Sequence, residues 1–421
     1  MTTLVRSCPG LVPLLPRSLM PPSAPVSSRT WLTANLLLQL AYGLLAMTIC
    51  LPSLPGWAQE FGATQAHVQL SFSAFVAAYG GLQLIYGPVS DRLGRKPVLL
   101  FGLALAGLGS LLGAFASDLN TVIAARALQG AGSAAGMVVG RALVQDLFQG
   151  RERPRMMAYI GMTMGLCPPL ATLLGGQVHE QLGWQLNFAL MAGLAVLAFI
   201  AAWRGLPVRG PHAPARSQQH WLRALLQSYA QLAREPAFLL YVVILAMTTA
   251  TFYCFLAGAP IVLAGYGVGP GQVGWYIMAI PFPYVLGNLL ASRLVSRWGD
   301  RKIMTLGQSA IFFALGLLLA LAWGGWRTPL AFALPLVFLG IGHGLLTPLA
   351  LAGTVGLLPA LAGAAAAVAG TAQQFTGAFG GYLVGLLTHE GPVNLGLLML
   401  ALTTLGWLAY LVLYRGVLKL R

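Results

Sequence analysis

Long apolar runs separated by short polar or charged breaks make up most of this sequence. A membrane-spanning helix needs about 20 predominantly apolar residues, and twelve runs are close to that length or longer. The predicted spans are residues 31–54, 69–87, 97–116, 121–143, 156–178, 184–203, 237–261, 272–292, 303–323, 329–352, 364–387 and 393–414. The pattern predicts an all-α polytopic membrane protein with twelve transmembrane helices.

The polar break at residues 204–236 divides the predicted helices into six and six. It is basic and contains several prolines, and its stretch from Trp221 to Leu226 is typical of an amphipathic helix on a membrane surface. The predicted organisation is a disordered cytoplasmic tail at 1–30, a first six-helix bundle at 31–203, a cytoplasmic linker with that helix at 204–236, a second six-helix bundle at 237–415 and a cytoplasmic tail at 416–421.

Composition and charge support a lipid environment. The chain is 57% hydrophobic and 8% charged, whereas a soluble domain carries about 25% charged residues. The net charge of +15 comes from basic clusters between the apolar runs, which favours membrane topology over nucleic-acid binding. With the N-terminus inside, 21 of the 24 Lys and Arg residues fall in cytoplasmic segments. The positive-inside rule then predicts that both termini lie in the cytoplasm.

Motifs for metal, phosphate or hydrolytic chemistry are missing from the sequence. The four cysteines, Cys8, Cys50, Cys167 and Cys254, have no metal-ligand spacing and suggest no disulfide framework. There is no Gly-x-x-x-x-Gly-Lys-Ser/Thr loop, so ATP is not expected as the direct energy source. We expect no cofactor, no metal and no enzymatic activity.

A charged turn between the second and third predicted spans is the most informative motif. It begins at Gly87 and places Asp91, Arg92, Gly94, Arg95 and Lys96 between two apolar runs. The Gly-x-x-x-Asp-Arg-x-Gly-Arg-Lys spacing resembles the signature loop of the major facilitator superfamily. That resemblance implies a secondary transporter with the major facilitator fold, in which this loop is a gating latch. The alternative is an ordinary solvated turn.

A degenerate second copy of this motif lies between predicted spans 272–292 and 303–323. Arg297 and Gly299 match Arg92 and Gly94 at a constant offset, while Ser296 replaces Asp91. Duplicated six-helix halves are a recurrent transporter architecture.

Arg126 lies inside the predicted span 121–143. A charge in a span is costly unless it faces a polar interior, so it is a functional candidate; the alternative is an arginine that snorkels to the interface. The sequence Arg126-Ala-Leu-Gln129-Gly resembles the motif of drug/proton antiporters, in which the arginine serves proton coupling. Gly183-Trp184 and the segment 141–148 resemble the Bcr/CflA-type multidrug exporters of that group.

One departure from those exporters concerns the proton carrier. They place an acid in the first helix where this chain has Thr48, and all nine Asp and Glu residues fall in loops or at helix ends. His343, central in the predicted span 329–352, is a possible substitute because imidazole titrates near neutral pH. The alternative for His343 is a hydrogen-bonded packing residue.

The resemblance also implies a central cavity lined by the first, fourth, seventh and tenth helices. The candidate cavity residues are Asn35, Gln39, Tyr42, Gln129, Thr248, Phe252, Tyr253, Gln373, Gln374 and Tyr382. Such an aromatic, weakly polar lining with no buried acid suits neutral or anionic amphiphiles better than lipophilic cations.

The resemblance thus implies an exporter of small drug-like compounds across a bacterial inner membrane, working by alternating access. We expect the proton gradient as its energy source, small-molecule substrate, protons and membrane lipid as its partners, and a functional monomer. Phenicol-like antibiotics are implied by resemblance alone. The alternatives are an uncoupled facilitator or importer of a metabolite, a membrane enzyme, and a non-transporting membrane sensor.

Overall fold

The computed structural model describes residues 26–150, 152–207, 221–358, 361–388 and 391–417. Every regular element among them is a helix. Most of the predicted tail at 1–30, the central part of the predicted linker and residues 418–421 lie outside the described residues. The domain limits given above stay predictions.

The first half of the chain forms seven α-helices and one 3-10 turn. They are α1 (Val26–Thr48), η2 (Leu51–Ser53), α2 (Leu54–Glu60), α3 (Gln65–Leu93), α4 (Arg95–Ala114), α5 (Leu119–Leu147), α6 (Glu152–Leu182) and α7 (Gln185–Gly205). The predicted span 31–54 is not one continuous helix, because α1 ends at Thr48 and a turn follows at Ile49–Cys50. Pro52 and Pro55 lack the backbone donors that would continue it.

The second half contains seven more α-helices and a terminal π-helical turn. They are α8 (Trp221–Ala233), α9 (Pro236–Gly265), α10 (Pro270–Ile277), α11 (Pro281–Trp323), α12 (Pro329–Gly356), α13 (Ala362–Leu386), α14 (Val393–Val412) and η4 (Leu413–Val417). The predicted span 272–292 is broken between α10 and α11, where Pro281 and Pro283 follow the break. Helix α8 forms where the sequence predicts an amphipathic helix; its place on the membrane surface stays a prediction.

Ten helical segments in the described part of the chain are long and apolar enough to cross a membrane. One of them, residues 270–323, holds both predicted spans 272–292 and 303–323. Helix α13 covers the predicted span 364–387 but is not among the ten. It carries Gln373 and Gln374 at its middle, and it packs between α3 and α9. The chain is an all-α, multi-pass membrane protein.

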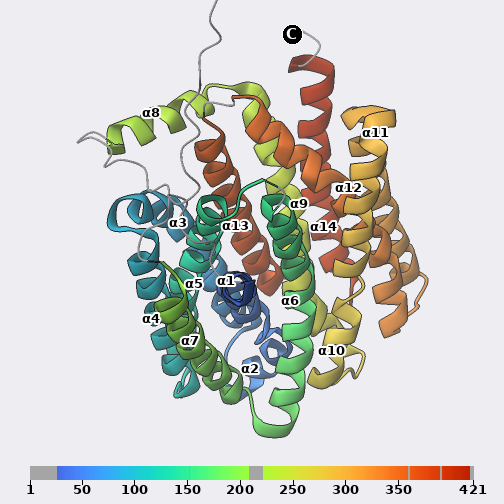
Figure 1. Cartoon of the computed structure of the whole chain (residues 1–421). Helices are drawn as coiled ribbons and strands as arrows, with labels where there is room; N and C mark the ends of the chain where they lie inside the picture. The colour runs from blue at the N-terminus through green and yellow to red at the C-terminus, as the bar shows by residue number, and fades with distance from the viewer. Residues whose placement is uncertain (1–25, 151, 208–220, 359–360, 389–390, 418–421) are drawn as a thin grey trace, which may run out of the picture.

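The helices pack as two groups that meet along two seams (Figure 1). Helices α1 and α3–α7 pack on one another, as do α9 and α11–α14. The seams are α3 against α13 and α6 against α10. On the first seam Ser73 Oγ donates to the Ala378 carbonyl at 2.7 Å, and Thr371 Oγ1 donates to the Gly80 carbonyl at 3.2 Å. Small residues on both helices allow this close approach.

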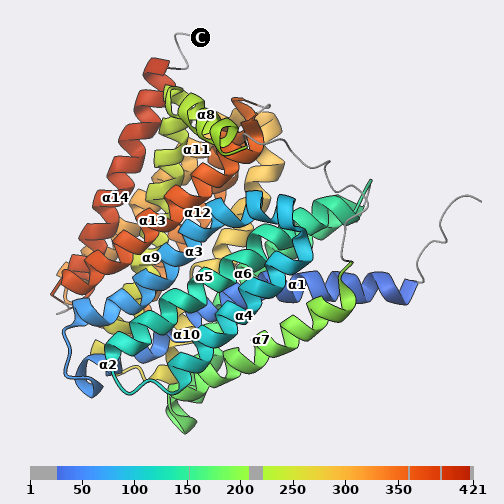
Figure 2. The ribbon, with the colours of Figure 1, turned by 90° about the vertical axis from the view of Figure 1, so that its left-hand side faces the viewer.

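Hydrogen bonds between α6 and α10 join the two groups at one end of the molecule. This end lies opposite the start of α1 and the end of α14. We call this the distal end, and the opposite one the terminal end. At the distal end Gln177 Nε2 donates to the Gly271 carbonyl at 3.0 Å, and the Gly271 N–H donates to Glu180 Oε2 at 3.1 Å. Figure 2 shows α1 and α14 diverging from there toward their terminal ends.

The two copies of the charged motif share a backbone conformation. Gly94, between α3 and α4, has φ 98° and ψ 147°. Gly299, inside α11, has φ 73° and ψ 159°. L-residues with a side chain rarely adopt such angles. Each glycine therefore turns the chain from one span into the next.

Candidate functional site

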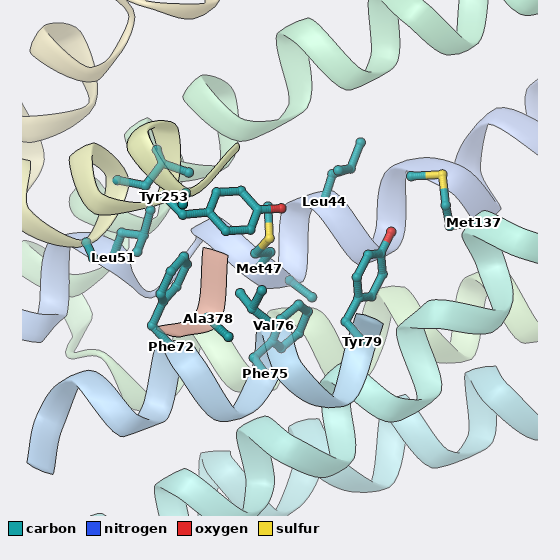
Figure 3. Close-up of a cluster of buried hydrophobic side chains, with 14 of the residues drawn as sticks. Leu44, Met47, Leu51, Phe72, Phe75, Val76, Tyr79, Met137, Tyr253 and Ala378 are labelled. Atoms are coloured by element: carbon teal, nitrogen blue, oxygen red, sulfur yellow. The ribbon is translucent and has the colours of Figure 1, made fainter. Parts of the chain in front are cut away.

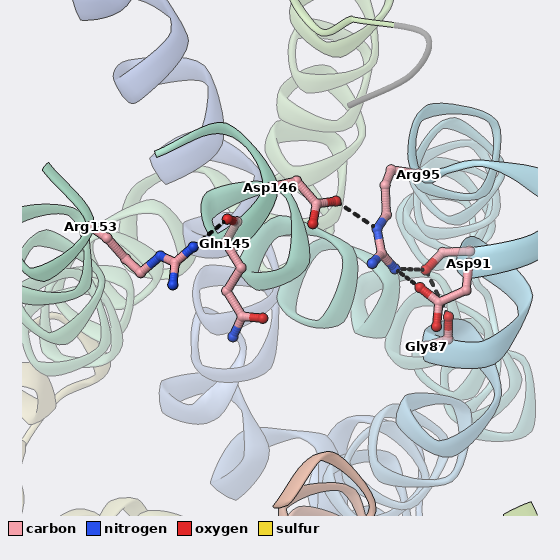
Figure 4. Close-up of polar contacts among 7 residues, drawn as sticks. Gly87, Asp91, Arg95, Gln145, Asp146 and Arg153 are labelled. Carbon is pink, nitrogen blue, oxygen red and sulfur yellow. Dashed lines mark hydrogen bonds and ion pairs between the residues drawn. The ribbon is translucent and has the colours of Figure 1, made fainter. Parts of the chain in front are cut away.

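Arg95 is the centre of the charged turn at the terminal end. Its guanidinium contacts Asp91 Oδ1 at 2.5 Å and Asp146 Oδ2 at 3.2 Å, and it donates to Ser90 Oγ at 2.8 Å (Figure 4). Asp146 belongs to the last turn of α5. Arg95 thus ties the turn between α3 and α4 to a third helix.

The rest of the predicted latch surrounds this ion-pair network. Lys96 Nζ donates to the Leu206 carbonyl at 2.8 Å, just after α7, and the Gly87 carbonyl accepts from Ser90 Oγ at 2.8 Å. Arg92 is exposed. These contacts hold the turn to the ends of α5 and α7 within the first helix group. The latch role itself stays a prediction.

Arg126 is almost completely buried, with 2% of its surface exposed. It donates to the Ala46 carbonyl at 2.6 Å, to the Met47 carbonyl at 3.0 Å and to Gln129 Oε1 at 2.6 Å. Its guanidinium also lies 4.2 Å from the centre of the Phe75 ring. Among the described residues, the contacts of this guanidinium include no carboxylate.

The position of these two carbonyls explains how they can replace an acid. Ala46 and Met47 lie in the last turn of α1, where α-helical carbonyls have no partner within the helix. The negative end of the helix dipole adds to their attraction for a cation. The break that Pro52 imposes on the first span thus creates the site that Arg126 occupies.

The polar face of α1 packs against helices of its own group. Asn35 Nδ2 donates to the Ala201 carbonyl at 2.6 Å and Gln39 Nε2 to the Ala198 carbonyl at 3.0 Å, both on α7. Tyr42 bonds to Ser110 of α4, which also accepts from Gln129. The structure does not bring these residues together with the candidates on α9 and α13. Their role in substrate binding stays a prediction.

A second set of candidates does meet at the junction of the two groups. Tyr253 of α9 donates its hydroxyl to Gln374 Oε1 of α13 at 2.7 Å. Gln373 Nε2 donates to Thr249 Oγ1 at 2.9 Å, again joining α13 to α9. Phe252 is half-buried beside Tyr253, and Tyr382 is half-buried on α13.

Aromatic residues of α3 complete this junction, and the sequence reasoning missed them. Phe72 lies edge-on to Tyr253 with ring centres 5.8 Å apart, and Phe75 stacks on Tyr79 at 6.0 Å. Figure 3 shows the Tyr253 ring facing these rings, with Met47 of α1 between them. The Tyr79 hydroxyl is buried and has no hydrogen-bond partner in the described part of the chain. The available signal was the helical spacing of Phe72, Phe75 and Tyr79, which puts them on one face of α3.

His343 and Thr248 lie elsewhere, inside the second helix group. His343 is 3% exposed and borders a small cavity formed with residues of α9, α11 and α14, among them Thr248. His343 is therefore not grouped with Arg126 or with the Tyr253–Gln374 pair.

The described part of the chain contains no candidate metal site. No group of three or more His, Cys, Asp or Glu residues there could hold a metal ion. Cys50 and Cys254 are buried, Cys167 is half-buried, and all three are free thiols. Cys8 lies outside the described residues.

Comparison with known proteins gives this arrangement a family context. The family model described as the Major Facilitator Superfamily matches residues 36–267 and 243–419. A crystal structure of a peptide transporter has the same fold, with a TM-score of 0.72 at 16% identity, over 93% of this chain and 95% of that one.

Curated relatives include proteins named for drug resistance. The chain is 30% identical to multidrug resistance protein D of Escherichia coli strain K12, over 87% of this chain and 92% of that protein. It is also 30% identical to a chloramphenicol resistance protein of Pseudomonas aeruginosa, over 75% of each. A bicyclomycin resistance protein homolog of Haemophilus influenzae is 26% identical, over 86% of this chain and 90% of that protein.

Proposed function

The chain belongs to the major facilitator superfamily, and we propose that it exports small drug-like compounds in exchange for protons. It is a membrane transport protein and not an enzyme. Relatives named for multidrug, chloramphenicol and bicyclomycin resistance support drug export. We place the protein in a bacterial inner membrane, with both termini in the cytoplasm, and propose that it functions as a monomer.

The observation that carries the proposal is the aromatic junction between the two helix groups. It combines the rings of Phe72, Tyr79 and Tyr253 with the amide of Gln374. These side chains would favour flat, weakly polar molecules once the two groups part, since aromatic rings supply area and the phenol and amide supply hydrogen bonds. The junction lies where two groups that rock against each other would expose a central site in turn.

Two further elements of the proposal concern energy and gating. Arg126 and His343 are the coupling candidates, because both are ionisable groups buried within membrane-spanning helices. Arg126 holds the end of α1 through two hydrogen bonds. A change in these bonds would therefore alter the position of that helix. The network around Arg95 is the proposed latch of the terminal end. Its bonds to Asp91 and Asp146 lie within the first helix group, so it would act by fixing how the ends of α3, α4 and α5 sit together when that end opens or closes.

Transport by purified protein in liposomes tests the proposal. With chloramphenicol as the probe, we expect accumulation driven by an imposed pH gradient and abolished when an ionophore collapses the gradient. Equal flux with and without the gradient would contradict proton exchange and favour an uncoupled facilitator.

Replacement of Tyr253 tests the substrate site. Tyr253→Ala should weaken the apparent affinity for chloramphenicol by up to about tenfold, because an aromatic contact contributes about 0.5–1.5 kcal/mol beyond area burial. Phe313→Ala is the matched control, since Phe313 is 55% exposed and pairs with Phe338 away from the junction. An unchanged affinity in Tyr253→Ala would exclude the junction as the site.

A further inference from the structure

Three buried polar atoms that have no hydrogen-bond partner among the described residues converge in the second helix group. They are His343 Nε2 on α12, Gln308 Oε1 on α11 and Thr403 Oγ1 on α14. Their side chains belong to residues that are 3%, 3% and 5% exposed. Buried polar atoms in folded proteins are almost always hydrogen-bonded, to protein or to ordered water, so three orphans in one place require an explanation.

All three residues line the same small cavity. Its volume is about 10 Å³, and Met247, Thr248, Ile311 and Gly406 complete its wall. A water molecule needs roughly 10–15 Å³ of such space and two to four polar partners. The cavity therefore has the size and the partners for one water molecule.

A metal cation fits this lining poorly. Divalent cations such as Ca²⁺ and Mg²⁺ take about six or more oxygen ligands. The cavity offers the side-chain oxygens of Thr248, Gln308 and Thr403, and the Thr248 hydroxyl already donates to the Ile244 carbonyl at 2.7 Å.

We propose that His343, Gln308 and Thr403 bind one internal water molecule, and that this water makes His343 the proton-accepting group of the second helix group. The second part rests on the proposed proton exchange. Among the described residues, none that lines the cavity from α9, α11 or α14 is charged or titrates. His343 is thus the titratable member of this site.

One water molecule can satisfy all three polar atoms in both protonation states of the imidazole. When Nε2 is unprotonated, the water donates to Nε2 and to Gln308 Oε1 and accepts from the Thr403 hydroxyl. When Nε2 takes up a proton, it donates to the water, which turns to donate to Gln308 Oε1 and Thr403 Oγ1. All three orphaned atoms are satisfied in each state. The two oxygens then face the positive charge and offset part of its cost at this depth.

The water is tested by hydroxyl-radical footprinting of the full chain in phospholipid nanodiscs. Radiolysis activates bound water, so His343 should be modified although it is buried. Met156 and Met191 of the first helix group, which are both 2% exposed and intrinsically more reactive, should stay unmodified. Modification of His343 no faster than that of Met191 would overturn the water site.

Substitution of one binding residue tests the site itself. Thr403→Val keeps the shape and removes the hydroxyl, so modification of His343 should be lost. Thr404→Val is the matched control, because Thr404 Oγ1 bonds only to the Leu400 carbonyl of its own helix among the contacts described. Unchanged His343 modification in Thr403→Val would overturn the assigned binding residues.

The proton role needs a separate measurement. His343→Gln keeps a hydrogen-bonding side chain but cannot titrate, so pH-driven uphill transport should be lost while exchange of substrate across the membrane continues. Retained pH-driven transport would overturn the proton role. If the unmodified protein shows no pH-driven transport at all, proton exchange fails as a whole, whereas the footprint still decides whether the water is bound.

Discussion

At the scale of single residues, Arg126 shows how a buried charge can be held by backbone. Its partners are two carbonyls in the last turn of α1 and the amide oxygen of Gln129. Sequence predicts a costly charge in a span, but it cannot name these partners because every residue carries a carbonyl. The free carbonyls become visible only once α1 is known to end at Thr48.

We expect Arg126→Ala to abolish transport while the protein remains folded in the membrane. Each buried acceptor that loses its donor costs about 1–3 kcal/mol. The three acceptors of Arg126 lie at the end of α1 and on Gln129, so we expect the loss to free the end of α1 rather than to break the packing of the helix groups. Arg126→Lys should recover the charge but only part of the transport, because an ammonium cannot reproduce the fork of a guanidinium. Chloramphenicol flux and gel-filtration profiles of the purified variants check this, and wild-type flux in Arg126→Ala would refute the role.

The neighbours that polar side chains contact could not be predicted from the sequence. Asn35, Gln39 and Tyr42 share one face of the first helix, as their spacing predicts. Which neighbour that face meets depends on the rotation of the helix about its axis, and the structure turns it toward α7 and α4. His343 is a similar case, since its helix was predicted correctly but its side chain borders α11 and α14.

At the scale of helices and turns, the positive φ of Gly94 in the charged motif makes a local prediction possible. Gly94→Ala should destabilise the protein by about 1–2 kcal/mol or more, because a side chain is disfavoured at positive φ. Gly87→Ala is the control in the same motif, since a Cβ there would lie 3.8 Å from Val138 Cγ1, an ordinary contact. Thermal denaturation in detergent measures both, and equal melting temperatures would contradict the backbone argument.

The charged turn itself is expected to control the rate of the conformational change. Asp91→Asn removes the charge that faces Arg95 and leaves Asp146 in place. It should slow substrate exchange across the membrane more than it weakens equilibrium substrate binding, since Asp91 is remote from the aromatic junction. Comparable losses in both measurements would count against a latch.

The sequence predicted the presence of the membrane-spanning helices well, because the thickness of the lipid bilayer sets the length of such a helix. Each predicted span overlaps a helix, and the turn at Gly299 lies where the degenerate motif places it. The errors fall at prolines, where Pro52 and Pro281 break spans that hydropathy alone reads as continuous. Helix α13 was predicted as a span although it contains Gln373 and Gln374, and in the structure it packs between α3 and α9.

At the scale of the whole molecule, two helix groups are tied together at the distal end and diverge toward the terminal end. Alternating access requires these ties to break and the opposite end to close. The contacts of Gln177 and Glu180 with Gly271 are therefore expected to be transient during transport, although they are hydrogen-bonded in this conformation.

A reversible bridge across the distal end tests this account most directly. Cysteines replace Gln177 and Gln272 in a chain whose native cysteines are changed to alanine, and a short cleavable bis-thiol reagent joins them in liposomes. We predict that the bridged protein stops gradient-driven chloramphenicol transport and regains it on cleavage, while each single-cysteine variant is unaffected by the reagent. Undiminished transport with the bridge intact would contradict alternating access between the two groups.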